Sequence, residues 1–96
     1  MYMLHVSYSK APADVEPHIE AHRQWVASAM REGTILFAGV KKSGLGGIIA
    51  VKNMPKADLL NLLAEDSYVQ ADVADYQIID FECKAGQPNV ADLIGA

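Results

Sequence analysis

Two histidines stand four residues apart in the segment His18–Gly33, which reads HIEAHRQWVASAMREG. On a helix this spacing places His18 and His22 on the same side, where two imidazoles can chelate zinc or copper. A third ligand would have to come from another element, and His5 is the only further histidine. Because no H-E-x-x-H motif and no cluster of cysteines or carboxylates accompanies the pair, we expect no metal site.

The apolar pattern of the same helix indicates which histidine is buried. Apolar residues recur at helical spacing at Val15, Ile19, Val26 and Met30. His22 falls on this stripe, three residues after Ile19 and four before Val26, whereas His18 is expected at the surface near the helix start. A hydrogen-bonded core histidine and a catalytic base are both compatible with that position of His22.

A second group that can take part in proton transfer lies at the end of the next predicted helix. The segment LLAEDSYV contains Glu65 and Asp66, with Tyr68 two residues later. A carboxylate beside a histidine fixes the orientation of the ring and stabilises its charged form, as a general acid or base requires. Asp66 could equally cap a helix, so the sequence leaves its role open.

Hydrophobic periodicity along the chain predicts the element order β-α-β-β-α-β. Alternation in MYMLHVSY indicates a strand over residues 1–8, with Tyr2, Leu4, Val6 and Tyr8 on one face and Met3, His5 and Ser7 on the other. We expect a helix capped by Asp14 and ended by Gly33, strands over 34–40 and 47–52, a helix over 54–66, an irregular stretch over 67–73 and a strand over 75–83. This order is the ferredoxin-like α+β arrangement, a four-stranded antiparallel sheet with two helices on one face.

Two of the predicted strands, in ILFAGV and GIIAV, are apolar on both faces. Two helices cover only one face of such a sheet, and a second subunit packed sheet to sheet would cover the other. The sequence therefore predicts a homodimeric α+β barrel. We expect residues 1–83 to form the domain and residues 84–96 to form a C-terminal tail that could pack on the partner subunit.

Composition limits the classes of partner and compartment. The 96 residues suffice for one domain, and the net charge of -4 leaves no basic face for nucleic acid. A single cysteine, Cys83, suits a reducing compartment. No apolar run is long enough to span a bilayer, and the first residues lack the pattern of a signal peptide. We expect a cytoplasmic protein with no nucleic-acid or membrane partner.

The chain contains, in order, YMLHVSY, a histidine (His22) eleven residues before Gly33, GTILFAGV, and Asp66-Ser67-Tyr68. The order and spacing of these motifs resemble those of the YciI-like proteins (YCII-related domain) in the dimeric α+β-barrel superfamily, where the last motif is usually D-P-[YF]. Ser67 in place of proline is expected to loosen that turn. The resemblance implies a homodimer with a cleft in which His22 and Asp66 face each other.

The resemblance also implies a class of chemistry that needs no cofactor. One characterised relative, a chloromuconolactone dehalogenase, removes HCl from a lactone, and muconolactone isomerases share the wider fold. Both reactions take a proton from a carbon next to a carbonyl. We expect a lyase or isomerase for a small organic acid or lactone, with His22 and Asp66 catalytic and with His5, Trp25 and Tyr68 binding the substrate. The main alternative is a non-catalytic small-molecule-binding or sensing module. A third possibility, a haem-degrading or antibiotic-biosynthesis monooxygenase-like barrel, is supported by fold analogy alone.

Overall fold

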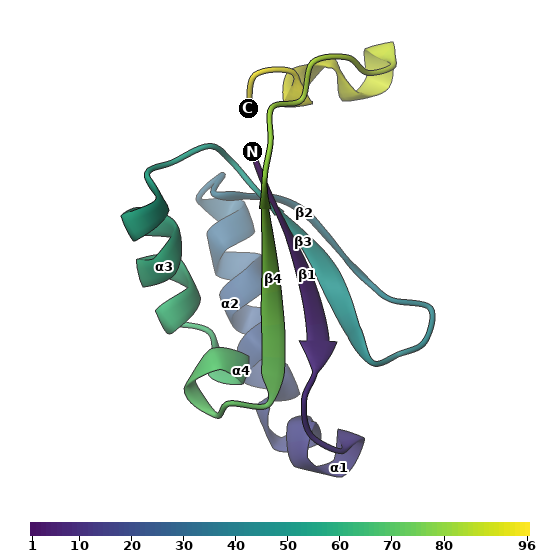
Figure 1. Cartoon of the computed structure of the whole chain (residues 1–96), viewed down its shortest axis with the longest axis vertical. Helices are drawn as coiled ribbons and strands as arrows, with labels where there is room; N and C mark the ends of the chain where they lie inside the picture. Colours follow the sequence, from purple (N-terminus) through teal and green to yellow (C-terminus); the bar gives the residue numbers. More distant parts are fainter.

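The computed structural model describes residues 1–96 and contains one four-stranded antiparallel sheet with helices packed on one face (Figure 1). The strands are β1 (Tyr2–Tyr8), β2 (Ile35–Val40), β3 (Gly46–Val51) and β4 (Ala74–Asp80), and they lie in the order β2-β3-β1-β4. The helices are α1 (Pro12–Val15), α2 (Ile19–Arg31), α3 (Lys56–Ala64) and α4 (Ser67–Gln70), with 3-10 segments η1 (Glu16–His18) and η2 (Pro88–Leu93). This arrangement confirms the predicted ferredoxin-like α+β fold.

Alternation along the central strand β1 determines which side chains enter the core. Tyr2, Leu4 and Val6 are buried against the helices, while the intervening residues, His5 among them, are half-buried on the opposite face. Residues opposite each other on antiparallel strands share a face of the sheet. The partners of the inward residues of β1 on β3 and β4 therefore also face the helices. The other buried apolar residues of this core include Val15, Ile35, Ile49, Val51, Leu59 and Leu63.

The helical segment after β1 begins earlier than the sequence predicted. Pro12 opens α1, where its fixed φ and missing N–H cost little, and Asp14 caps no helix. A second proline, Pro17, lies in the 3-10 segment η1 that separates α1 from α2. The predicted end of the long helix is confirmed, because Gly33 follows α2 with a φ of +79°, a conformation that favours glycine.

The predicted irregular stretch after α3 contains the helical turn α4. Asp66 caps this turn by accepting a hydrogen bond from the backbone N–H of Tyr68, at 3.1 Å. The hydroxyl of Ser67 donates to the carbonyl of His18 at 2.8 Å and so ties α4 to the start of α2. Proline could not make this bond, and the expectation that Ser67 loosens the turn stays a prediction.

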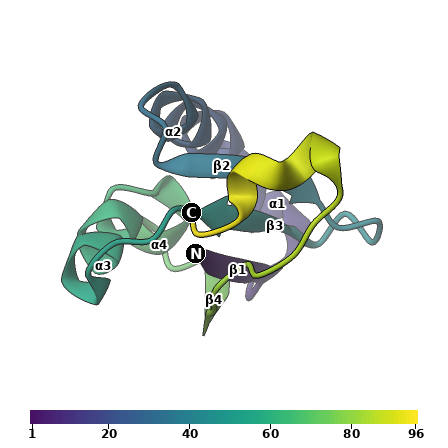
Figure 2. The same ribbon diagram turned by 90° about the horizontal axis from the view of Figure 1, so that it is seen from above.

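The other face of the sheet carries no helix (Figure 2). Phe37, Ala50, Met3 and Ile79 form a row across that face. Phe37 and Ile79 at the ends of this row are 40% and 48% exposed. No helix of the structure has both the length and the apolar character that crossing a membrane requires.

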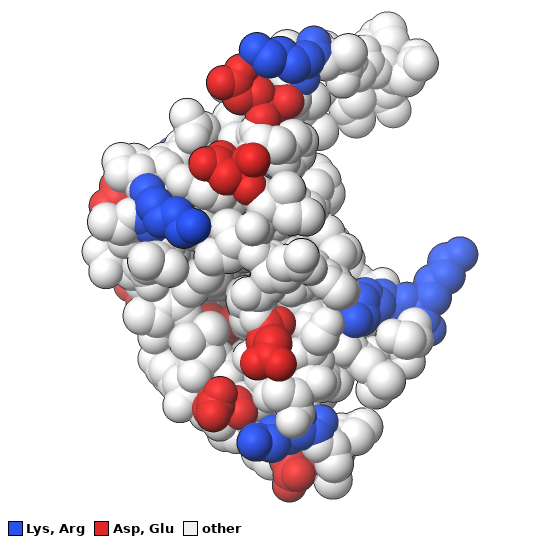
Figure 3. Space-filling model, in the orientation of Figure 1, with Lys and Arg blue, Asp and Glu red and all other residues white.

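The chain beyond β4 forms an arm at one end of the sheet. β4 ends at Asp80, three residues before the predicted end, and the N–H of Phe81 then donates to the carbonyl of Met1. Figures 1 and 2 show that the segment with η2 reaches out on the side away from α2 and α3. Figure 3 shows a hollow between this arm and the β2–β3 loop, which carries Lys41 and Lys42.

Candidate functional site

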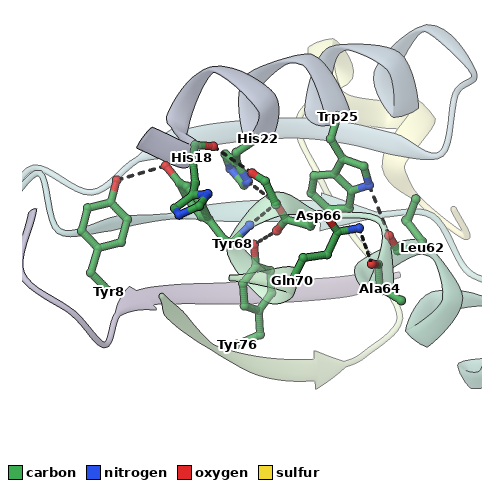
Figure 4. Close-up of polar contacts among 11 residues, drawn as sticks. Tyr8, His18, His22, Trp25, Leu62, Ala64, Asp66, Tyr68, Gln70 and Tyr76 are labelled. Atoms are coloured by element: carbon green, nitrogen blue, oxygen red, sulfur yellow. Dashed lines mark hydrogen bonds and ion pairs between the residues drawn. The ribbon is translucent and has the colours of Figure 1, made fainter. Parts of the chain in front are cut away.

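His22 on α2 and Asp66 at the start of α4 are joined by a hydrogen bond (Figure 4). Nδ1 of His22 lies 2.7 Å from Oδ1 of Asp66, and the same oxygen accepts the N–H of Tyr68. An ionised carboxylate only accepts hydrogen bonds, so the network assigns the proton of a neutral imidazole to Nδ1. Nε2 then carries the lone pair and makes no hydrogen bond within the protein. Asp66 therefore both caps α4 and partners His22.

Asp66 is completely buried, with a relative exposure of 0%. A buried carboxylate is costly unless its oxygens are paired, and here Oδ2 accepts a hydrogen bond from the hydroxyl of Tyr76 on β4. No buried side-chain nitrogen or oxygen lacks a partner. Burial, together with the bond to Asp66, raises the pKa of Tyr76 above the ordinary tyrosine value, so its hydroxyl stays a donor.

The aromatic ring of Tyr68 fixes the orientation of His22 from one side. The two rings stack with centroids 3.9 Å apart and an angle of 3° between their planes. The hydroxyl of Tyr68 lies 3.4 Å from that of Tyr8 on β1, and these two rings are perpendicular. Burial raises the pKa of Tyr68, and the hydrogen bond to Tyr8 adds to this effect.

A pocket of about 520 Å³ opens between α2 and the β2–β3 hairpin, beside this cluster. Its walls are mainly apolar, and the polar side chains that reach it are Tyr8, His22, Arg23 and Tyr68. Arg23 is exposed and makes no ion pair, since the two ion pairs of the structure are His22–Asp66 and Lys84–Glu82. Asp66 does not line the pocket; it lies behind His22. The pocket thus offers a base nitrogen, hydroxyl groups and a free cation.

Glycines form the hairpin wall of this pocket. A Cβ at Gly46, where φ is +133°, would lie 2.0 Å from the carbonyl oxygen of Val6. At Gly47 a Cβ would lie 2.4 Å from the carbonyl oxygen of Gly39. Both contacts are with backbone, which cannot move aside as a side chain can. Close packing of strand backbones therefore requires glycine at these two positions.

Comparison with known proteins identifies a structural relative. No protein-family model matches the chain, and neither does any curated protein. A solved structure matches instead, that of 5-chloro-2-hydroxyhydroquinone dehydrochlorinase (TftG) from Burkholderia phenoliruptrix AC1100 in complex with 2,5-dihydroxybenzoquinone. The TM-score is 0.61 with 12% sequence identity, over 85% of this chain and 94% of that chain. The two proteins share a fold.

The structure does not bring His5 to the pocket. Its side chain lies on the face of the sheet opposite to His22, where Nε2 is 3.3 Å from Nζ of Lys41. Lys41 also donates to the hydroxyl of Ser7 at 3.2 Å. The alternation of β1 turns His5 away from the helices and from the pocket that Tyr68 lines, and the expectation that His5 binds the substrate stays a prediction.

Trp25 lies next to the site but does not line the pocket. Its Nε1 donates to the carbonyl of Leu62 on α3 at 3.2 Å, and its ring centroid is 5.7 Å from that of His22. Trp25 therefore packs α2 against α3 beside the histidine. No group of three His, Cys, Asp or Glu side chains could hold a metal ion, and the absence of a metal cofactor stays a prediction.

Sequence reasoning missed Tyr8, Arg23 and Tyr76 as members of the site. A signal existed for both tyrosines, because strand alternation places Tyr8 with Val6, and Tyr76 with Ile78, on the inward face. No comparable signal marked Arg23, whose place beside the pocket depends on how α2 packs on the hairpin.

Proposed function

We propose that the protein is a cofactor-independent lyase or isomerase of the YciI-like type, in the dimeric α+β-barrel superfamily, acting on a small organic acid or lactone. The observation that carries the proposal is the hydrogen bond between His22 and Asp66, which leaves Nε2 of His22 free at the wall of a pocket. The fold shared with a dehydrochlorinase supports lyase chemistry. His22 acts as general base and then acid, and Asp66 orients it.

The proposed reaction begins when Nε2 of His22 removes a proton from a carbon next to a carbonyl. Asp66 stabilises the imidazolium that forms, without taking the proton itself. In a dehydrochlorination, the electron pair of the broken C–H bond forms a C=C bond and chloride leaves with the electron pair of the C–Cl bond. In an isomerisation, the imidazolium returns the proton to another carbon of the same molecule. General acid–base catalysis of this kind contributes roughly 10²- to 10⁴-fold in rate.

The lining of the pocket supports an organic acid as substrate. Apolar side chains such as Val26 and Ile49 would contact the carbon skeleton, and Tyr68 would contact it beside His22. The unpaired guanidinium of Arg23 would bind a carboxylate or another anionic oxygen. The volume of about 520 Å³ is in the range of small-molecule sites.

We infer that two copies pair through the uncovered face of the sheet. The row from Phe37 to Ile79 is apolar and partly exposed, and a second sheet would bury it. The tail of residues 84–96 stands out beside this face and would then pack on the partner subunit. The single free cysteine, Cys83, supports a cytoplasmic location.

The test of the enzymatic proposal is turnover of a carbon acid by the purified protein in D₂O. We would supply 5-chloro-2-hydroxyhydroquinone, a chloromuconolactone and muconolactone, and follow chloride release and deuterium incorporation. We expect turnover of at least one, reduced about 100-fold or more in His22→Ala. His18→Ala is the matched control, since only the backbone carbonyl of His18 makes a hydrogen bond near the site. Tight binding of these compounds without exchange or chloride release would contradict the enzyme and favour the binding module.

A further inference from the structure

Tyr8 and Tyr68 present an unused hydrogen-bond donor to the pocket. Both side chains line it, and their hydroxyl oxygens lie 3.4 Å apart. The pair carries two hydroxyl protons, and the bond between the oxygens uses one of them. Neither hydroxyl makes another hydrogen bond within the protein. One O–H therefore remains free to donate to a molecule in the pocket.

Burial indicates which of the two tyrosines provides this free donor. Tyr68 is only 4% exposed, whereas Tyr8 is half-buried. The arrangement that suits this difference has Tyr68 donating to Tyr8 and Tyr8 donating to the ligand. A hydroxyl that accepts one hydrogen bond becomes a stronger donor of the next, so Tyr68 strengthens Tyr8. The raised pKa of Tyr68 keeps the first proton of this chain in place.

We propose that Tyr8 is a catalytic residue whose hydroxyl donates to the substrate oxygen on which negative charge develops, with Tyr68 as its positioning residue. This inference rests on the proposed function. When Nε2 of His22 removes the proton, the C–H electron pair forms a C=C bond and the carbonyl π electrons move to oxygen. A donor at that oxygen stabilises the enolate more than the starting carbonyl. The substrate class is therefore an enolisable carbonyl compound.

The donor can be tested without knowing the substrate, because a phenolate resembles an enolate. We would titrate the protein with 4-nitrophenol, measure Kd, and read the ionisation state of the bound probe from its absorbance. We expect the phenolate to bind in preference to 4-nitroanisole, its neutral counterpart. Tyr8→Phe should weaken phenolate binding about 10- to 100-fold, as expected for loss of a hydrogen bond to a charged group. Tyr68→Phe keeps the ring stacked on His22 and should weaken binding by about 3- to 10-fold.

Tyr2→Phe is the matched control, because its hydroxyl donates to the carbonyl of Met54 and does not reach the pocket. Equal phenolate affinity in wild type and Tyr8→Phe, or no phenolate binding by wild type, would overturn the inference. If Tyr8→Phe does not fold, proton NMR of the wild-type protein replaces the variant. A tyrosine hydroxyl resonance that moves downfield with 4-nitrophenolate but not with 4-nitroanisole would support Tyr8 as the donor. A resonance that does not move with either compound would overturn the inference. This measurement needs no turnover. A protein that binds phenolate through Tyr8 but exchanges no substrate proton would contradict the proposed function alone.

Discussion

The hydroxyl of Tyr76 donates a hydrogen bond to Oδ2 of Asp66, a carboxylate ten residues earlier in the chain and completely buried. His22 and the backbone of Tyr68 donate to the other oxygen. Three elements, α2, α4 and β4, therefore converge on one carboxylate. Since each oxygen of Asp66 is held by a different partner, the orientation of His22 is fixed from the sheet as well as from the helices.

Replacement of Asp66 by asparagine removes the negative charge of the side chain while keeping its size nearly unchanged. We expect Asp66→Asn to lose about 1–3 kcal/mol of stability, because an amide group then faces hydrogen-bond donors in a buried site. Activity should fall on the order of 100-fold, since the imidazolium of His22 loses its counter-charge. Urea denaturation and steady-state kinetics measure the two effects. Glu65→Gln is the control, as Glu65 is exposed and adjacent in sequence, and an equal loss in both variants would contradict a specific role for Asp66.

Alkaline pH should destabilise the protein in part through Tyr76. Its pKa is raised in the folded state above the value of 10.0 for a free tyrosine. Below pH 10 the hydroxyl of Tyr76 is protonated in both the folded and the unfolded chain. Above pH 10 the unfolded chain loses this proton first, so the free energy of unfolding falls as pH rises. The slope for one such group is about 1.4 kcal/mol per pH unit. Tyr76→Phe should be less stable at neutral pH but lose stability less steeply between pH 10 and 11, and parallel curves from urea titrations would contradict this.

A methyl group at Gly46 should be poorly tolerated. The added Cβ would meet the carbonyl oxygen of Val6 at 2.0 Å, and the φ of +133° is strained for any other residue. We expect Gly46→Ala to lose at least about 2 kcal/mol in chemical denaturation. Gly39→Ala, with no atom within 4 Å of the added Cβ and no positive φ, should change stability little. Similar losses in the two variants would mean that the strands can shift to make room.

The uncovered sheet face predicts a mutation that separates subunits. Ile79→Lys places a charge at the end of the apolar row on that face, where Ile79 is 48% exposed in the single chain. We expect sedimentation analysis to give a dimer for wild type and a shift toward monomer for this variant. Leu60→Lys on α3 is the control, since Leu60 is 51% exposed on the helical side. A wild-type monomer, or an equal shift in both variants, would contradict pairing through the sheet.

Local periodicity was enough to predict the fold and the inward position of His22. The alternation of β1 and the 3.6-residue spacing of α2 are both set by the core that each element must bury. Pro12 and Pro17 show where this reasoning failed. Apolar spacing does not report that one proline starts a separate helix and the other lies in a 3-10 turn, so the sequence predicted one helix with the wrong cap.

The site was harder to predict because its members come from four elements. The contact between His22 and Asp66 was implied by the resemblance to the YciI-like proteins, whereas the residues alone left the role of Asp66 open. His5 shows the value of strand alternation, since the pattern of β1 already placed its side chain on the face opposite to Tyr8. Arg23 becomes part of the pocket only through the packing of α2 on the hairpin, which depends on contacts far apart in the sequence.

The glycine wall of the pocket limits how the shape of the pocket can change. Gly46 and Gly47 cannot accept side chains without moving a neighbouring strand, so the hairpin side of the pocket has a nearly fixed shape. The opposite wall is a helix surface, where Val26, Ala27 and Met30 point into the same space. Libraries that vary these three positions of α2 should therefore change which molecules the pocket binds, while the glycines stay the same.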